Sequence, residues 1–198
     1  AEIVIEEATG IDIDYVAVID FSAFKKLIDM VGGIDVYAPR EFVETSQWGW
    51  EFRVPKGMNH MNGETALYYA RSRYSTSDFD RSRRQQDIIM ALGDKLTRKE
   101  ILANPVKLNA VLNAISDGID TNIDLISLLG MVKYADILKD NNMRKLVLDD
   151  SENSLLMSGH VNGSYVLYPK EGMENYTQSR EKFRNIFESD ALNNNNPS

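Results

Sequence analysis

The chain has 198 residues, of which 43% are hydrophobic and 26% charged, an ordinary balance for a globular protein with one core. Its formal net charge of −8 argues against sequence-independent binding of nucleic acid, which requires a broad basic surface. Without cysteine it can form no disulfide, no thiolate nucleophile and no classical structural zinc site. No apolar run approaches the roughly 18 to 20 residues that span a bilayer, and the first residues lack the pattern of a signal peptide, so we expect any signal or anchor to be absent from this chain.

The first part of the chain alternates between helix and strand signals. Residues 1–9 read as the tail of a helix, and 15–19 form a compact apolar, β-branched run that predicts a buried strand. A helix is expected over 21–31, and a second strand over 34–37. This order suggests a βαβ-like unit and predicts an α/β fold, a three-layer α/β/α arrangement with a central mixed β-sheet flanked by helices.

The segment from 39 to 55 carries a weaker signal. Trp48 and Trp50 flank Gly49 in a hairpin or a mobile loop. Exposed tryptophans near a pocket can stack on sugar rings, but packing within a hairpin is the interpretation we favour.

Arginines gather in one short stretch. The chain has 11 arginines, and five of them fall among the 14 positions from 71 to 84: Arg71, Arg73, Arg81, Arg83 and Arg84. Asn62 is expected to cap a helix over 63–70 that delivers the first two, whose alternate spacing would aim both at one site. An acidic protein that concentrates guanidinium groups in this way is expected to bind phosphate or carboxylate there.

A long helix is predicted after Ser77 or Asp78, with an inward stripe that changes character along its length. At about 100° per residue, two arginines and a glutamine share the side of the apolar positions, while Arg83 and Gln86 fall opposite. The stripe comprises Arg81, Arg84 and Gln85, then Ile88, Ile89, Leu92 and Leu96. Such a helix could hold a phosphate at its start and line an apolar pocket further along. Alternatively, the arginines pair with nearby carboxylates, and the pattern alone leaves both interpretations open.

The remaining chain predicts further helices over 105–115, 125–139 and 175–187, strands over 145–148 and 165–168, and a polar, disordered tail over 189–198. His60 and His160 lie a hundred residues apart and are expected at the surface or in loops rather than in catalysis. There is no Walker A loop, dinucleotide fingerprint, HExxH or GxSxG motif. The class of reaction that this leaves is phosphate chemistry, in which arginines and acidic residues act by position and charge, usually with Mg2+.

The runs ALYYARSR (66–73) and SDFDRSRRQQ (77–86) together resemble the signature of the LytR-CpsA-Psr family, roughly ALxYxRxR followed by DFxRxxRQQ. The runs IDYVAVIDFSAFKKLIDMVGGIDV before them and VLYPKEGMENY near the end agree with the family. The resemblance extends from about Glu2 to about Phe187.

This resemblance implies a phosphotransferase at the outer face of the cytoplasmic membrane, chiefly of Gram-positive bacteria. It would attach secondary glycopolymers, teichoic acid or capsular polysaccharide, from a polyprenyl diphosphate carrier to peptidoglycan, with Mg2+ bridging the diphosphate. The residues it implies for the diphosphate are Arg71, Arg73, Arg81, Arg84 and Gln85. Asp78 and Arg81 would be catalytic, with Asp78 ordering the arginines or taking part in acid/base work. Ile88, Ile89 and Leu92 would face the polyprenyl chain.

The resemblance is to the central and C-terminal part of the family's catalytic domain. The family's strands with metal-binding acidic residues lie further upstream, so we expect a single domain over 1–188 that is incomplete at its N-terminus, with no metal ligand of its own and Mg2+ held mainly by that upstream segment. We therefore expect the isolated chain to need a complementary chain or segment for stability. The competing hypothesis is a non-catalytic binding module for polyprenyl phosphate or an anionic glycan. A transcriptional regulator is disfavoured because no basic recognition helix is evident.

Overall fold

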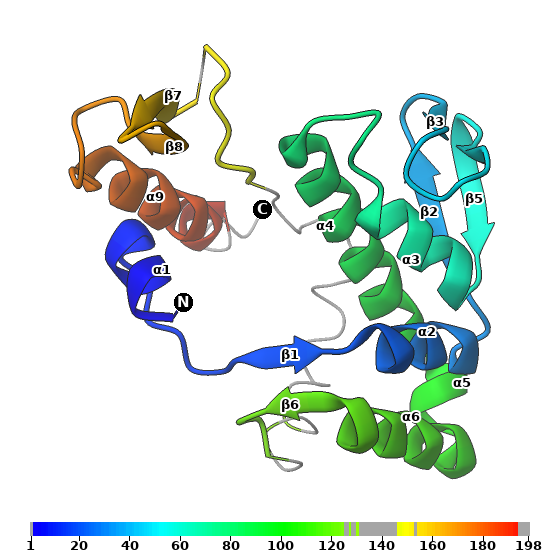
Figure 1. Cartoon of the computed structure of the whole chain (residues 1–198). Helices are drawn as coiled ribbons and strands as arrows, with labels where there is room; N and C mark the ends of the chain where they lie inside the picture. Colours follow the sequence, from blue (N-terminus) through cyan, green and yellow to red (C-terminus); the bar gives the residue numbers. More distant parts are fainter. Residues whose placement is uncertain (1, 125–126, 128–129, 131–145, 153, 194–198) are drawn as a thin grey trace. The chain divides into compact units, whose positions relative to one another are not determined.

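The computed structural model describes residues 2–124, 127, 130, 146–152 and 154–193 (Figure 1). Its contacts divide the chain into two compact units, one made of Ala1–Val16 with Leu146–Ser198 and the other of Ala17–Lys145. We describe each unit by itself, and the single domain expected over 1–188 stays a prediction. No helix in the described part is both long and apolar enough to cross a membrane.

The smaller unit combines two helices with a hairpin. Its elements are α1 (Glu2–Thr9), β7 (Leu156–Val161), β8 (Ser164–Pro169) and α9 (Thr177–Asn193). The antiparallel strands β7 and β8 are joined by Asn162 and Gly163, which both have positive φ (52° and 81°), as a two-residue hairpin turn requires. Helices α1 and α9 are in contact, and Arg180 Nε donates to the Glu7 carbonyl at 2.8 Å.

Several predictions are decided in this unit. Helix α1 confirms the helix that ends before Gly10, and β8 confirms the strand predicted at 165–168. No strand forms over 146–148, because β8 pairs with β7 instead. Helix α9 confirms the closing helix but continues to Asn193, so the disordered tail predicted from 189 is wrong for 189–193, while 194–198 lies outside the described residues.

The larger unit carries the arginine-rich stretch. Its elements are β1 (Ala17–Ile19), α2 (Phe21–Met30), β2 (Ile34–Ala38), β3 (Phe42–Glu44), β4 (Phe52–Val54), β5 (Gly57–Met61), α3 (Gly63–Arg71), α4 (Asp78–Leu96), α5 (Lys99–Leu102), α6 (Pro105–Gly118) and β6 (Ile119–Thr121). The helix predicted over 125–139 lies almost entirely outside the described residues.

Mixed helices and strands confirm the α/β class. Within the described part the strands pair as two-stranded antiparallel sheets, β1 with β6, β2 with β5 and β3 with β4, rather than in one mixed sheet. The expected βαβ-like unit is therefore not formed, because Val18 on β1 pairs with Asp120 while Asp35 on β2 pairs with His60. The antiparallel partner of β2 is β5, and the connection between them contains the hairpin of β3 and β4.

The caps predicted at Asn62 and Ser77 are confirmed, and a further cap lies at Asp20. Asp20 caps α2 by accepting the Ala23 N–H at 2.7 Å. Asn62 caps α3 and Ser77 caps α4. Of the hairpin and the mobile loop left open for 39–55, strands β3 and β4 form the hairpin. These local signals fix where each helix begins, and so where the arginines are placed.

The core of this unit lies between α2, α3, α4 and the strands. Its members include the fully buried side chains Ile28, Ile34, Val36, Met61 and Ile88. At the far end of α4, Lys95 Nζ and His60 Nδ1 both contact the Asp35 carboxylate at 2.7 Å. Hydrogen bonds from Lys95 and His60 lower the pKa of Asp35. These contacts fix helix α4 to β2 and β5. His60 on β5 and His160 on β7 are both exposed, as expected, and both lie on strands.

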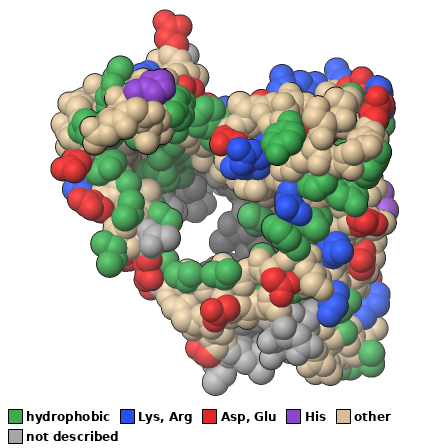
Figure 2. Space-filling model, in the orientation of Figure 1, with side chains coloured by type: hydrophobic (Ala, Val, Ile, Leu, Met, Phe, Trp, Pro, Cys, Tyr) green, Lys and Arg blue, Asp and Glu red, His purple; other side chains and the backbone are tan. Residues whose placement is uncertain are grey.

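Strand β1 differs from its prediction. The run 15–19 was expected as a buried strand, but β1 covers 17–19 and Val18 is 62% exposed. Figure 2 shows hydrophobic side chains at the surface along β1. Burial of a strand requires a layer over its faces, and in the described residues β1 has only β6 at one edge.

Candidate functional site

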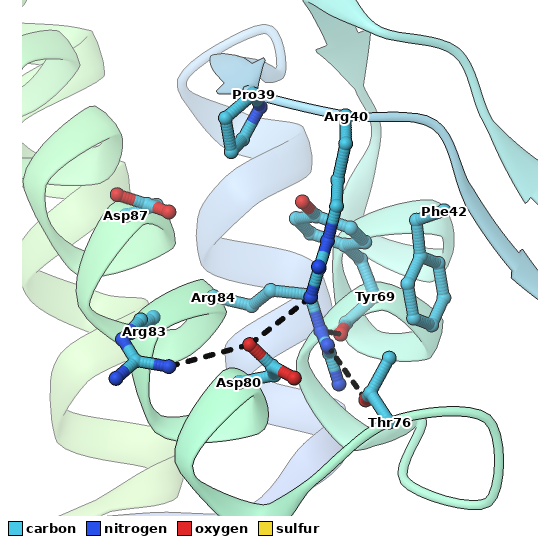
Figure 3. A pocket seen from close by; sticks show the side chains of 9 residues that line it. All are labelled: Pro39, Arg40, Phe42, Tyr69, Thr76, Asp80, Arg83, Arg84 and Asp87. Atoms are coloured by element: carbon cyan, nitrogen blue, oxygen red, sulfur yellow. Dashed lines mark hydrogen bonds and ion pairs between the residues drawn. The ribbon is translucent and has the colours of Figure 1, made fainter. Parts of the chain in front are cut away.

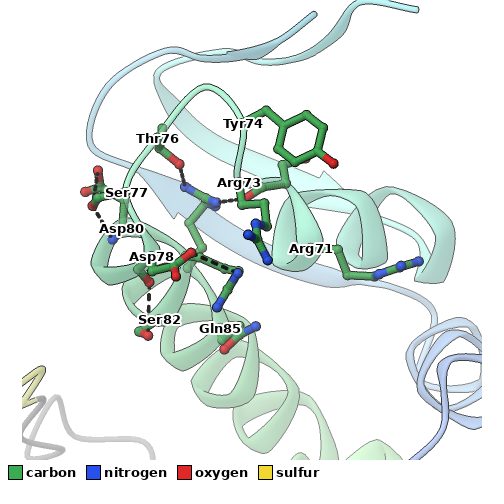
Figure 4. A network of polar contacts seen from close by, with 12 residues as sticks. Arg71, Arg73, Tyr74, Thr76, Ser77, Asp78, Asp80, Ser82 and Gln85 are labelled. Carbon is green, nitrogen blue, oxygen red and sulfur yellow. Dashed lines mark hydrogen bonds and ion pairs between the residues drawn. The ribbon is translucent and has the colours of Figure 1, made fainter. Parts of the chain in front are cut away.

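The candidate site lies where the end of α3 meets the start of α4 (Figure 4). Residues 72–77 connect the two helices. The Ser77 hydroxyl accepts the Asp80 N–H at 3.0 Å and so starts α4. This brings the arginines at the end of α3 near those of the first turns of α4.

A buried carboxylate shapes this connection. Glu44 on β3 is fully buried, and its Oε1 accepts the N–H groups of Ser46 (3.0 Å) and Gln47 (3.2 Å). Its Oε2 accepts the N–H groups of Tyr74 and Ser75 and the Ser75 hydroxyl, each at 3.1 Å. Burial alone would raise the pKa of Glu44, but these hydrogen bonds outweigh it and the pKa is lowered. Glu44 is therefore an anion that ties the β3–β4 loop to the α3–α4 connection.

The β3–β4 loop also holds the backbone on both sides of Ser72. Gln47 Nε2 donates to the Arg71 carbonyl at 3.1 Å, and Gln47 Oε1 accepts the Arg73 N–H at 2.8 Å. Trp48 Nε1 donates to the Ser72 hydroxyl at 2.9 Å. These contacts fix the directions in which the two arginine side chains leave the chain.

Arg84 lies beneath the connection rather than at its surface. Its Nε donates to the Tyr69 carbonyl at 2.9 Å, its Nη1 to the Thr76 hydroxyl at 3.0 Å and its Nη2 to the Ser72 carbonyl. The guanidinium also stacks over the Phe42 ring, 4.5 Å from its centre. Burial lowers the pKa of this guanidinium. Arg84 thus supports the loop, and its predicted contact with the diphosphate is not supported by this geometry.

The open face of α4 carries the other polar residues. Arg81 Nη1 pairs with Asp78 Oδ1 at 3.0 Å, and both side chains keep part of their surface exposed. Gln85 Nε2 donates to the Ala70 carbonyl at 3.2 Å. In Figure 4 the Arg73 side chain points toward the same space as Asp78 and Gln85. Arg81 therefore pairs with a carboxylate, as one interpretation expected, and yet lines an open surface.

Arg71 takes a different direction. Its guanidinium lies 4.1 Å from the centre of the Phe21 ring and 5.5 Å from that of Trp48. Figure 4 shows it extending away from Arg73. The expectation that both arginines point to one spot is therefore wrong, because Ser72 is extended while Arg71 still belongs to α3. Arg71 lies at the edge of the site.

The predicted lipid positions are divided between two faces of α4. Ile88 is buried in the core and Leu92 packs against it, so Ile88 does not lie at the open surface, and its contact with a lipid stays a prediction. Ile88 follows the buried Arg84 by one helical turn, which places both on the inward face. Ile89, by contrast, is 66% exposed and continues the line of Arg81 and Gln85 on the open face.

A hollow lies on another side of α4 (Figure 3). This cavity of about 330 Å³ has Arg40, Asp80 and Arg83 at its rim. Asp80 Oδ1 contacts Arg40 at 3.2 Å and Arg83 at 3.3 Å. Burial would raise the pKa of Asp80, but the hydrogen bond from Ser77 and the charge of Arg40 lower it overall. Arg84 and Asp87 also line this hollow, and Arg40, Arg83 and Arg84 are already held there by Asp80 or by the Tyr69, Ser72 and Thr76 oxygens. Arg83 lies away from the open face, as predicted.

The described residues contain no group of three or more His, Asp or Glu side chains that could hold a metal ion. Beside the arginines, Asp78 contacts Arg81 and Asp80 contacts Arg40 and Arg83. These residues by themselves do not fit Mg2+.

Comparison with known proteins agrees with the motif. The LytR_cpsA_psr family model matches residues 2–182. The chain belongs to the LytR-CpsA-Psr family. Among its relatives, the polyisoprenyl-teichoic acid–peptidoglycan teichoic acid transferase TagV of Bacillus subtilis is 38% identical over 123 residues, covering 60% of this chain and 31% of TagV. Biofilm regulatory protein A of Streptococcus mutans is 32% identical over 143 residues, covering 68% of this chain and 34% of that protein.

Solved structures of the family share the fold. The crystal structure of Bacillus subtilis TagV matches with a TM-score of 0.69 and 29% identity, covering 93% of this chain and 68% of that chain. TagT bound to LIIa-WTA matches with a TM-score of 0.65 at 18% identity, covering 93% of this chain and 65% of that chain, which supports the fold alone. The chain spans about a third of the length of the two relatives above.

The sequence analysis did not identify Glu44 and Gln47, two residues that hold the α3–α4 connection of the candidate site. Glu44 ends the strand Phe42–Glu44 at a position where the alternation calls for an inward, apolar side chain. An acidic residue at such a position signals a buried anion with several donors. Gln47 carried no comparable signal, since its role depends on contacts 24 and 26 residues away.

Proposed function

We propose that this chain binds the diphosphate of a polyprenyl-linked glycopolymer and serves its transfer to peptidoglycan. The observation that carries the proposal is the open face of α4, where Arg81, Asp78 and Gln85 lie beside Arg73 and lead to the exposed Ile89. Guanidinium groups suit phosphate oxygens, and an exposed isoleucine beside them suits a prenyl chain. The teichoic acid transferase activity for which TagV is named supports teichoic acid as the glycopolymer class, with capsular polysaccharide as the alternative.

The proposed reaction is the phosphotransfer that the family resemblance implies. A hydroxyl oxygen of peptidoglycan bonds to the phosphorus that carries the glycopolymer, and the bond from that phosphorus to the bridging oxygen breaks. Polyprenyl phosphate leaves with the electron pair, and the hydroxyl proton is taken up by a base. Arg73 and Arg81 stabilise the charge that develops on the phosphates, and Asp78 orients Arg81 through its 3.0 Å contact. Because the acceptor is peptidoglycan, the site acts outside the cytoplasmic membrane.

Mg2+ is proposed from the family resemblance alone. Its test is calorimetry of geranylgeranyl diphosphate binding with Mg2+ and with EDTA. Equal affinity in both would remove the ion from the proposal for this chain.

The proposed function is tested by a matched pair of variants. Arg81→Ala should weaken geranylgeranyl diphosphate binding by roughly 10- to 150-fold, the value of a charge-assisted contact. Arg83→Ala removes the same group from the same helix on the opposite side, and should leave the affinity unchanged. Equal affinities for the two variants would show that the open face is not the site.

Turnover separates the enzyme from a binding module. Transfer is followed with lipid-linked teichoic acid as donor and peptidoglycan as acceptor. Binding that depends on Arg81 without any transfer would favour the non-catalytic module for polyprenyl phosphate or anionic glycan. Transfer that is normal in Arg81→Ala would contradict the assignment of this residue.

A further inference from the structure

A row of aromatic side chains begins at the edge of the site. The Arg71 guanidinium lies over the rings of Phe21 (4.1 Å) and Trp48 (5.5 Å). The Trp48 ring is 4.9 Å from that of Tyr68, and the Tyr68 ring is 5.4 Å from that of Trp50. We call Phe21, Trp48, Tyr68 and Trp50 the aromatic row. It joins the start of α2, the β3–β4 loop and α3.

Both ends of the aromatic row are open to solvent. Phe21 is 55% exposed at one end and Trp50 is 48% exposed at the other. The middle is fixed, because Trp48 Nε1 donates to the Ser72 hydroxyl at 2.9 Å and Tyr68 packs between the two tryptophans. Single exposed aromatic residues are common at protein surfaces. The aromatic row differs from these because its rings are fixed by contacts and it starts at the Arg71 guanidinium. It is therefore a surface suited to binding a ligand.

Polar groups border the aromatic row. The Tyr68 hydroxyl donates to Glu64 Oε1 at 3.0 Å, and Glu51 follows Trp50 directly in the chain. Gln47 lies next to Trp48 in the same loop. A pyranose ring has an apolar face of C–H groups and a rim of hydroxyls, so it requires an aromatic face with donors and acceptors around it. The aromatic row and its border supply both.

We propose that the aromatic row binds pyranose rings of the glycan attached to the diphosphate. This inference rests on the proposed function, since it takes the diphosphate to lie at Arg73 and Arg81. Two directions lead away from that point. The prenyl chain follows α4 toward the exposed Ile89, while Arg71 extends away from Arg73 toward Phe21 and the row. The glycan, which leaves the diphosphate at its other end, takes the second direction.

The decisive measurement compares two ligands on the full 198-residue chain. One is geranylgeranyl diphosphate, and the other is the same lipid diphosphate carrying a disaccharide of N-acetylhexosamines. The disaccharide should increase the affinity by about 2- to 10-fold, the value of one or two ring contacts. Trp50→Ala should abolish this increase, Trp50→Tyr should restore most of it, and neither should change the affinity for the lipid diphosphate without sugar.

A control and a second readout keep the test sharp. Tyr37→Ala removes another exposed aromatic ring, on β2, and should preserve the full increase. Because Trp48 and Trp50 are the two tryptophans of the chain, the Trp50 indole N–H signal is assigned in NMR spectra by comparison with Trp50→Phe. That signal in the unmodified chain should shift with the disaccharide ligand and not with the bare lipid diphosphate. This readout decides the matter even if Trp50→Ala fails to fold.

The possible outcomes distinguish the two proposals. No increase in affinity from the disaccharide, or an increase that persists in Trp50→Ala, overturns the aromatic row while the diphosphate site stands. No binding of either lipid, with a Trp50 shift caused by the free disaccharide, overturns the proposed function and leaves a sugar site. A Trp50 shift with a soluble peptidoglycan fragment but not with the lipid-linked disaccharide would overturn the donor glycan as the occupant and assign the row to the acceptor.

Discussion

The Glu44 carboxylate on β3 accepts the backbone N–H of Ser75, 31 residues further along the chain, at 3.1 Å. The same side chain accepts two N–H groups of its own loop. A loop between two helices has few backbone partners, and here a buried anion supplies them. The position of Arg73, two residues before Ser75, therefore depends on a residue that never reaches the surface.

We expect Glu44→Gln to lower the free energy of unfolding by about 1–3 kcal/mol at neutral pH, because the donors lose a charged acceptor. The folded state lowers the pKa of Glu44 below its ordinary value of 4.5. Its contribution is thus complete above that value and is lost as the pH falls through the lower pKa of the folded state. Urea titrations of both chains should show a difference that shrinks below pH 4.5. Glu41→Gln, at an exposed partner of Arg53, is the control, and a difference independent of pH would contradict the expectation.

Arg84→Ala should destabilise the protein far more than Arg81→Ala. Three oxygens, from Tyr69, Ser72 and Thr76, lose their donor when Arg84 is removed, at a cost of about 1–3 kcal/mol for each group left unpaired in the interior. Arg81 forms a partly exposed ion pair, worth at most about 1 kcal/mol. Thermal unfolding of the two variants measures the difference. Equal stabilities would show that Arg84 does not support the loop as described.

These two arginines also show how far the sequence alone can lead. The helix, its Ser77 cap and the sides of Arg83 and Ile88 follow from helical periodicity, because spacing along a helix fixes direction. Periodicity places Arg81, Arg84 and Gln85 in one broad stripe, and it cannot tell which part of the stripe meets the core. That division depends on what packs against α4, here the strands and the Tyr69 and Ser72 carbonyls, which come together only in three dimensions.

Strand prediction had a different limit. The composition of residues 15–19 identified a strand correctly, but exposure of Val18 depends on whether another layer covers it. The partner of β1 is β6, about a hundred residues away in the pairing of Val18 with Asp120, which no local pattern could indicate. By contrast, a hairpin of β3 and β4 was one of two alternatives that the sequence of 39–55 offered, because its residues lie within one short segment.

Ile88 and Ile89 should respond in opposite ways to truncation. Ile88→Ala leaves a cavity in the core and should cost about 2–5 kcal/mol of stability, whereas Ile89→Ala should change it by no more than about 0.5 kcal/mol. If the prenyl chain follows the open face, Ile89→Ala should lower the affinity for geranylgeranyl diphosphate more than the affinity for inorganic diphosphate. Calorimetry with both ligands tests this. An equal change for the two would place the lipid elsewhere.

Asp78→Asn should show whether the Asp78 carboxylate mainly orients Arg81 or mainly repels the phosphate by its negative charge. The variant keeps the size of the side chain but weakens its contact with Arg81 Nη1. We expect lipid diphosphate to bind several-fold more weakly, because Arg81 is no longer held, and we expect transfer to fall further than binding. Ser82→Ala on the same helix turn is the control. Binding that becomes tighter in Asp78→Asn would mean that the carboxylate mainly repels the ligand.

The exposed apolar surface of β1 predicts association. Val18 is 62% exposed, and within the described chain β1 pairs with β6 alone, so one edge still offers N–H and C=O groups to a further strand. Sedimentation velocity should therefore show mass rising with protein concentration, and Val18→Lys should return the chain to a monomer, because a charge on an edge strand opposes pairing. Val106→Lys places the same charge at an exposed valine of α6 and should leave the association intact. A chain that stays monomeric at all concentrations and unfolds only at high temperature would show that β1 needs no partner. If association occurs, a complementary segment that covers β1 should abolish it, because the exposed side chains of β1 would then be buried in each molecule. Binding to the folded state should also raise the melting temperature.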